Sequence, residues 1–290
     1  MATLITNSYC DLTAFKQYFA ENGITDSADD NVIAGILNGT SRWIDSATRQ
    51  RVFYPVIEAR LFSLPNSDAG WRSFRKLYVD RDLLECTTLT NGNADVISAS
   101  AYYLEDPNFT PRYAVVLKET SGVVWQYSLT GNREYVISVE GVWGYHDDLP
   151  SAFAARSLLT AGVNASVTSV AVTTATGALF SNGMIVKVGA EYIAVDSVAT
   201  DTLTVRRGVN GSTAAAHLLG DAVYQYIPMT GITEATKRIG LQAYRRFGNA
   251  SASGQMQVTA AGIVITPKDV SALDAQLLES LKSRRITGQY

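Results

Sequence analysis

The sequence has little of the residue types that build most catalytic and metal sites. Its 290 residues include two histidines and two cysteines. A structural zinc site needs four such ligands, and Ser–His–Asp or Cys–His catalysis needs a histidine beside its partners, so these classes are disfavoured. Charged residues make up 18%, and the net charge is −3. Nucleic-acid-binding proteins normally carry a strong basic excess, so a dedicated nucleic-acid binder is disfavoured as well.

Long apolar runs and targeting signals are also missing. No apolar run approaches the roughly 18 residues of a membrane-spanning helix. The first residues, MATLITNSYCDLTAF, lack the charged start and apolar centre of a secretory signal. We therefore expect a protein made in a cytoplasm, with no membrane partner. Cys10 and Cys86 stand far apart, and we interpret them as small buried side chains, with a disulfide or a reactive thiol as alternatives.

The residues that remain for chemistry are isolated from one another. His146 lies in the run Gly144–Asp148, and because neighbouring residues rarely converge on one ion, we expect a solvated turn there. His217 follows three alanines and has Asp221 as its nearest acidic neighbour. The sequence contains neither a phosphate-binding Gly-Lys-Ser/Thr loop nor a G-x-S-x-G nucleophile turn. We predict no catalytic residue, no metal and no cofactor, and a protein that is not an enzyme.

Both ends of the chain have helical patterns. A helix is expected after Asp11, and a second from Asp26 or Ser27, with an apolar stripe that continues to Ala47 and ends before Pro55. Helical spacing returns over Ile232–Phe247 and again after the cap Thr266-Pro267, following two short strands at Met256–Thr259 and Ile263–Ile265.

The middle of the chain has two β-rich blocks. Between Lys76 and Tyr145, runs rich in Val, Ile, Thr and Tyr predict five or six antiparallel strands, Val123–Leu129 among them, with a turn at Asn91-Gly92. Residues 165–227 form a second block, with a hairpin turn at Gly189-Ala190. It is compact enough to be a small barrel or sandwich.

These patterns predict an α+β fold. The N- and C-terminal parts form a helical core, which two antiparallel β blocks interrupt. The expected segments are a helical part (1–75), a β domain (76–148), an inserted small β module (149–228) and a second helical part with a tail (229–290). Their net charges are −1, −6, 0 and +4, so an acidic middle precedes a basic end.

Several segments together have a recognisable pattern of helix caps and strand edges. They are Tyr9–Leu12, the helix Asp29–Thr48 with Arg51–Tyr54, Leu77–Leu84, Gly141–Tyr145 and Arg206–His217. In these segments the chain resembles the head–tail connector (adaptor) proteins of tailed bacteriophages, in their longer form with inserted β domains, and the similarity covers nearly the whole chain.

The resemblance implies a structural virion protein at the head–tail interface. Such adaptors form a ring, usually dodecameric, that binds the portal protein, extends the DNA channel and offers a platform for a downstream tail or nozzle protein. Genomic DNA passes through without specific binding, which an acidic middle favours because it repels phosphates. We predict that the tail docks on the portal through Arg284, Arg285, Ile286 and Tyr290. We predict a subunit interface that contains Trp43, Arg49, Arg51, Tyr244, Arg245 and Arg246, because arginine forms bidentate contacts that fix register.

Two other functions stay open. The 149–228 module is a candidate for a carbohydrate- or receptor-binding virion protein, although it lacks the tryptophan that sugar sites often use. A hydrolase of cell-wall glycan needs only two carboxylates, which the acidic middle supplies, and it is the less favoured alternative.

Overall fold

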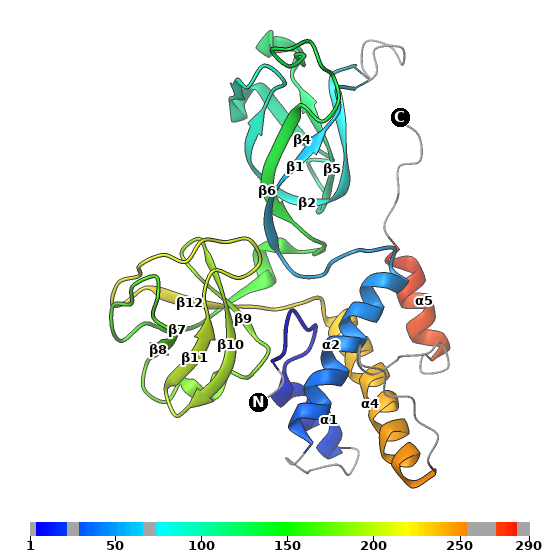
Figure 1. The fold of residues 1–290 in the computed structure, drawn as a ribbon, viewed down its shortest axis with the longest axis vertical. Helices are drawn as coiled ribbons and strands as arrows, with labels where there is room; N and C mark the ends of the chain where they lie inside the picture. Colours follow the sequence, from blue (N-terminus) through cyan, green and yellow to red (C-terminus); the bar gives the residue numbers. More distant parts are fainter. Residues whose placement is uncertain (1–3, 22–28, 66–73, 254–270, 283–290) are drawn as a thin grey trace. The chain divides into compact units, whose positions relative to one another are not determined.

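The chain divides into two compact units. The computed structural model describes residues 4–21, 29–65, 74–253 and 271–282. Met1–Tyr54 and Pro150–Lys282 form one unit, which we call the helix–barrel unit, and Pro55–Leu149 forms the other, which we call the β unit. The chain enters the β unit at Pro55 and leaves it at Leu149 (Figure 1).

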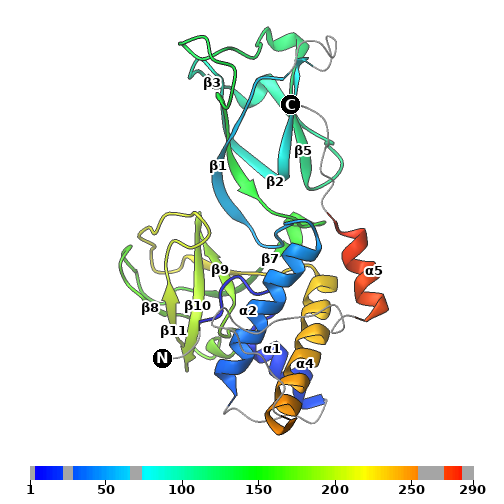
Figure 2. The ribbon, with the colours of Figure 1, turned by 45° about the vertical axis from the view of Figure 1, so that its right-hand side comes forward.

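The β unit is a six-stranded antiparallel sheet in the order β1-β6-β2-β5-β4, with β3 paired to β2. Figure 2 labels β1, β2, β3 and β5 of this sheet. Its inner face buries Leu83, Val115, Ile137 and Trp143. Short 3₁₀ turns, η2 (Ala99–Ala101) and η3 (Glu119–Ser121), lie between strands. The strands are β1 (Val56–Phe62), β2 (Lys76–Thr90), β3 (Val96–Ile97), β4 (Tyr102–Glu105), β5 (Arg112–Leu117) and β6 (Ile137–Trp143).

The second sheet closes on itself. Its order is β7-β12-β9-β10-β11-β8, and the two outer strands meet through a bridge between Leu159 and Val172, so it forms a small barrel. Gly189, at φ +58°, makes the tight turn between β9 and β10, at the position the sequence predicts. The elements are η4 (Leu149–Ala152), β7 (Phe153–Leu158), β8 (Ser169–Ala171), η5 (Gly177–Leu179), β9 (Ile185–Val188), β10 (Glu191–Ala199), β11 (Thr202–Arg206) and β12 (Ala222–Tyr226).

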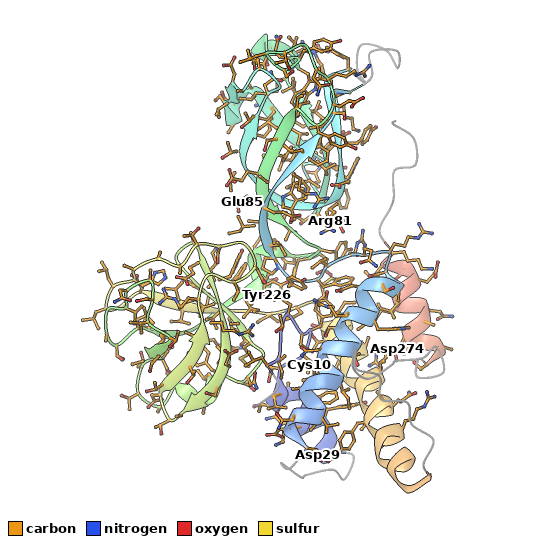
Figure 3. The ribbon with its side chains drawn as sticks, viewed as in Figure 1. Cys10, Asp29, Arg81, Glu85, Tyr226 and Asp274 are labelled. Carbon is orange, nitrogen blue, oxygen red and sulfur yellow. The ribbon has the colours of Figure 1, made fainter. Side chains whose placement is uncertain are left out.

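The helices are α1 (Leu12–Glu21), α2 (Asp30–Ala47), α4 (Thr230–Ser253) and α5 (Ala272–Ser280). α2 contacts the other three helices, and its stripe Ile33, Ile36, Leu37 and Ile44 is fully buried. α5 is fixed by Asp274, which is completely buried and pairs with Arg238 of α4 (Figure 3).

Hydrogen bonds join the barrel to the helical segments. The Tyr226 hydroxyl on β12 donates to the Phe53 carbonyl at 3.0 Å. The Leu12 amide, at the start of α1, donates to the Asn182 carbonyl at 3.0 Å, and the Arg206 side chain donates to the Ile5 carbonyl at 2.9 Å. The helices and the barrel are therefore parts of one packed unit.

This architecture contradicts the fold class expected from the sequence. The described residues are mostly β, with twelve strands in two six-stranded antiparallel sheets and four α-helices, so the expected helical core interrupted by β blocks is wrong. The physical reason is where apolar surface is buried. Two hydrophobic core clusters lie inside the two sheets, whereas each helix buries one stripe against its neighbours and against segments tied to the barrel.

Some local predictions also need correction. The expected strand Val123–Leu129 has no strand structure, because this segment hydrogen-bonds to neighbouring turns. β2 runs unbroken from Lys76 to Thr90 through Asp80–Asp82, a run of residues typical of turns, with a register shift in its pairing there. The expected strands after residue 255 and the Thr266-Pro267 cap lie outside the described residues.

Candidate interaction surface

One end of the β unit lies far from both of its connections to the rest of the chain. Val56, just after the chain enters, pairs with Trp143, just before it leaves, and Phe62 pairs with Ile137 at the other end of the same two strands. Because a strand rises about 3.3 Å per residue, roughly 20 Å separates these ends. The loops after Phe62 and before Ile137 therefore lie at the far end.

Exposed apolar side chains gather in three segments at this end. Such groups are normal when they are scattered singly, but several together mark interaction sites. We call this set the apolar end, and it comprises Leu61 (58% exposed), Val96 (68%), Val124 (37%), Tyr127 (57%), Leu129 (85%) and Tyr135 (65%).

Hydrogen bonds hold the three segments together. The Asn91 side chain donates to the Val124 carbonyl at 2.9 Å and accepts from the Gln126 amide at 2.8 Å. The Leu64 amide donates to the Arg133 carbonyl at 2.9 Å. The apolar end is therefore built on three hydrogen-bonded segments: the turn after β2, the end of β1 and the segment before β6.

Leu129 stands at the tip of a tight turn. The Ser128 amide donates to the Asn132 carbonyl at 2.8 Å, and the Gly131 amide donates to the Ser128 carbonyl at 2.9 Å. The Ser128 hydroxyl also accepts from the Asn132 amide at 2.9 Å. Gly131 has φ +80°, which only glycine adopts without cost. The turn therefore presents the most exposed of the large apolar side chains on a fixed backbone.

Tyr135 is held in an unfavourable backbone conformation. Its φ of +54° is left-handed, which costs a non-glycine residue about 1–2 kcal/mol. The Tyr135 amide donates to the Ser63 hydroxyl at 3.2 Å, which fixes this geometry. Strain of this kind tends to occur at functional positions, because the surrounding structure must maintain it.

The charges around the apolar end are mainly negative. Asp95 and Glu134 are exposed, and neither forms an ion pair with another described residue. Arg133 is the basic neighbour in the same segment. Over residues 55–149 the sequence has 8 basic and 13 acidic residues, a net charge of −5. The surface therefore combines apolar side chains with a negative field.

A dense group of titratable side chains lies in the barrel. The Glu191 side chain is buried, with the residue 1% exposed, and its carboxylate accepts hydrogen bonds from Arg207 and His217. Arg207 donates to its two oxygens at 2.7 Å each, and His217 Nε2 lies 2.8 Å from Oε2. The amides of Gly208 and Ala215 donate at 2.9 and 3.0 Å. Burial by itself would raise the pKa of Glu191, but these five donors outweigh it and hold the pKa at about 2.

This cluster is a structural crosslink. Both carboxylate oxygens of Glu191 are fully used, so no lone pair is left open for a substrate or an ion. The cluster connects β10 to the 207–217 loop, and the sequence had offered His217 only Asp221 as a partner. The structure places Asp221 at 3.8 Å from the histidine ring, farther away than Glu191. The prediction missed this pairing because 26 residues separate Glu191 from His217.

A second buried carboxylate lies on α2. Asp45 accepts a hydrogen bond from the Tyr9 hydroxyl, and its other oxygen pairs with Arg42 at 3.0 Å. The Tyr9 hydroxyl in turn accepts from the Phe53 amide at 3.0 Å, and Arg42 lies over the Tyr54 ring at 5.2 Å. Burial raises the pKa of Asp45 to about 6, although Arg42 and Tyr9 oppose the shift. The group links the N-terminal segment, α2 and the chain leading to the β unit.

The predicted interface residues lie in different environments. Arg51 is buried and donates to the Leu281 carbonyl at 2.7 Å, so it holds the end of α5. Tyr244 donates to Asp29 at the start of α2 at 2.5 Å. Trp43 is half-buried on α2, and Arg49 is exposed just after that helix. Arg245 and Arg246 are exposed on α4.

The predicted portal-docking residues, Arg284, Arg285, Ile286 and Tyr290, lie outside the described residues. The described chain ends close by, where Leu281 is buried and its carbonyl accepts from Arg51. Lys282 is the last described residue. The predicted docking segment therefore begins directly after an anchored helix.

The other residues considered for chemistry are inside the fold. The expected solvated turn is found only in part: Asp147 and Asp148 are exposed, but His146 is 6% exposed, and its Nδ1 accepts from the Asp148 amide at 3.0 Å. Cys10 is buried and Cys86 half-buried, and burial raises the pKa of both free thiols. Within the described ranges, no three His, Cys, Asp or Glu side chains are grouped as metal ligands would be.

Sequence reasoning missed the apolar end. The sequence predicts a strand over Val123–Leu129, in which alternate side chains would be buried. The available signal was Ser128–Asn132, a run of turn-forming residues around one leucine. The segments that meet here are separated by 30 or more residues, and only the folded chain brings them together.

No protein-family model and no curated protein matches this chain. Among the described helices, none is long and apolar enough to span a membrane.

Proposed function

We propose that the chain is a structural virion protein, a subunit of a head–tail adaptor ring. It binds the portal protein, extends the channel through which DNA passes without specific binding, and offers a platform for a downstream tail or nozzle protein. It acts without catalysis, at the head–tail interface of a virion assembled in the host cytoplasm. The observation that carries the proposal is the apolar end, because exposed apolar groups on a fixed scaffold are typical of assembly surfaces.

The arrangement of the chain supports this role. The helix–barrel unit is tied together by hydrogen bonds and buried ion pairs, so it suits a rigid ring body. The β unit is inserted into it through two connections, and the apolar end lies away from them. The sequence resemblance to adaptors supplies the portal and the tail as the two partners.

Portal binding is tested with a truncation. Ending the chain after Lys282 removes Arg284, Arg285, Ile286 and Tyr290 and leaves the Arg51–Leu281 contact in place. Full-length protein mixed with purified portal is expected to give rings in negative-stain electron microscopy. The truncated protein is expected to give none, with an unchanged thermal melt. Normal rings from the truncated protein would refute tail docking, and a single copy at the virion vertex would refute the ring.

A carbohydrate- or receptor-binding virion protein is the second candidate. Three exposed aromatic rings in and near β4 and β5 favour it: Tyr103 (43% exposed), Phe109 (68%) and Tyr113 (43%). Amphipathic rings of this kind present flat faces to ligands. The barrel, where the sequence had placed this function, has Tyr224 as its exposed aromatic residue, at 39%. Binding on a glycan array that Tyr103→Ala abolishes and Tyr224→Ala preserves would favour this candidate.

A further inference from the structure

We propose that the apolar end of the β unit binds a partner protein by inserting Leu129 into an apolar pocket that is edged by basic side chains. The inference deepens the proposed function and rests on it, because it names the chemistry of the surface that the partner must offer. The argument has three steps: the rigidity of the turn, the exposure of its side chains and the charge around them.

The turn is already in one conformation before any partner binds. Backbone hydrogen bonds of 2.8 and 2.9 Å close it, and the Ser128 hydroxyl adds another. A side chain on a preorganised loop loses less conformational entropy on binding than one on a mobile loop. Leu129 therefore has the backbone support expected of an anchor residue.

The exposed side chains have the composition of an interface centre. Leu129 is 85% exposed, and Tyr127 and Tyr135 in the same segment are 57% and 65% exposed. Tyrosines are enriched among the residues that dominate binding energy. Because Leu129 stands at the tip of a convex turn, the complementary shape is a pocket.

Charge decides what kind of surface holds that pocket. Two acidic residues, Asp95 and Glu134, and one basic residue, Arg133, lie beside the apolar end. The β unit as a whole carries a net charge of −5. A negative field disfavours anionic membranes, which attract basic segments. It also disfavours pairing with another β unit of the same sign. A protein with a basic rim complements the surface and associates faster with it.

The test measures binding of the purified downstream tail protein, titrated against portal-bound rings and against the free chain. Leu129→Ser is expected to weaken binding at least tenfold. Adding Tyr127→Ser and Tyr135→Ser to this variant is expected to weaken binding further. Glu134→Lys is expected to weaken binding severalfold, and added salt to reduce the wild-type affinity. The matched control is Leu218→Ser in the barrel, 73% exposed, which is expected to stay within twofold of wild type.

Each other outcome has a distinct meaning. The inference is overturned if portal-bound rings do not bind the tail protein. It is also overturned if wild-type and Leu129→Ser rings bind the tail protein equally well. Both outcomes leave the adaptor function standing. Absence of portal rings refutes the adaptor function, while the free-chain titration still decides the inference. Leu129-dependent binding to phosphatidylcholine or phosphatidylserine vesicles would assign the surface to a membrane. A Leu129-dependent dimer in sedimentation would assign it to a second copy. Either result overturns the inference.

Discussion

Glu191 in the barrel and Asp45 on α2 are both buried carboxylates of the helix–barrel unit, and their pKa values shift in opposite directions. That of Glu191 falls to about 2, and that of Asp45 rises to about 6. Glu191 receives five donors, two of them backbone amides, whereas Asp45 receives one hydroxyl and one guanidinium. The difference shows that the number of hydrogen-bond donors, more than burial, decides whether a buried carboxylate stabilises the fold as an ion.

The largest expected effect comes from removing the charge of Glu191. Glu191→Gln leaves the Arg207 side chain, 5% exposed, buried without its carboxylate. Breaking a buried pair in this way costs about 3–5 kcal/mol. Calorimetry at pH 7 is expected to show a lower melting temperature for the helix–barrel unit and an unchanged β unit. Glu140→Gln, on the exposed face of β6, is the control, and a loss below about 1 kcal/mol at Glu191 would contradict the crosslink.

The same residue contributes to the loss of stability at acidic pH. The pKa of Glu191 is 4.5 in its ordinary state and about 2 in the fold, so its contribution is present above pH 4.5 and is lost as the pH falls towards 2. Unfolding of wild type between about pH 5 and pH 2 is expected to include this loss. Glu191→Gln removes it from the profile.

Asp45 gives a smaller effect of the opposite sign. Its pKa is about 6 in the fold and 3.8 ordinarily, so the folded chain holds the proton more tightly. This contribution to stability falls as the pH rises from about 4 to 6, by at most about 3 kcal/mol, and is constant above. Relative to wild type, Asp45→Asn is expected to gain stability over that range in urea unfolding. If wild type instead gains stability relative to Asp45→Asn as the pH rises, the pKa of Asp45 is lowered.

The smallest effect is expected at an ion pair exposed to solvent. Lys16 and Asp30 lie 2.8 Å apart with side chains 29% and 42% exposed. Such pairs contribute about 0–1 kcal/mol, because water and salt screen them. Lys16→Gln is expected to change the free energy of unfolding by less than about 0.5 kcal/mol at physiological salt. If Lys16→Gln lowers the free energy of unfolding as much as Glu191→Gln does, the distance between the charged atoms decides how much an ion pair stabilises the fold. Burial and the number of hydrogen-bond donors would then not matter.

Buried and exposed tyrosine rings have different roles in this protein. In the helix–barrel unit, rings such as Tyr9, Tyr192 and Tyr226 are buried, and their contacts hold the N-terminal segment and the barrel together. In the β unit, Tyr127 and Tyr135 remain exposed on fixed turns. Buried rings of the first kind contribute to stability, and exposed rings of the second kind are available to a partner.

Local patterns in the sequence predicted several elements well. The stripe of α2 is a run of apolar residues at helical spacing, and the turn at Gly189 requires a residue that tolerates positive φ. Both depend on residues close together in the chain. The strand expected over Val123–Leu129 failed because β propensity describes a pleated, half-buried surface, and here no neighbouring strand pairs with the segment.

Composition and periodicity by themselves determined that the chain has helical ends, two β-rich blocks and few residues suited to metal or nucleophilic catalysis. The tertiary structure decided the rest, because the deciding contacts join distant residues. It placed the barrel and the helices in one unit through Tyr226 and Phe53, 173 residues apart. It gave Glu191 its five donors and assembled the apolar end from three segments. The energy of a buried charge or an exposed ring depends on which neighbours surround it, and only folding brings those neighbours together.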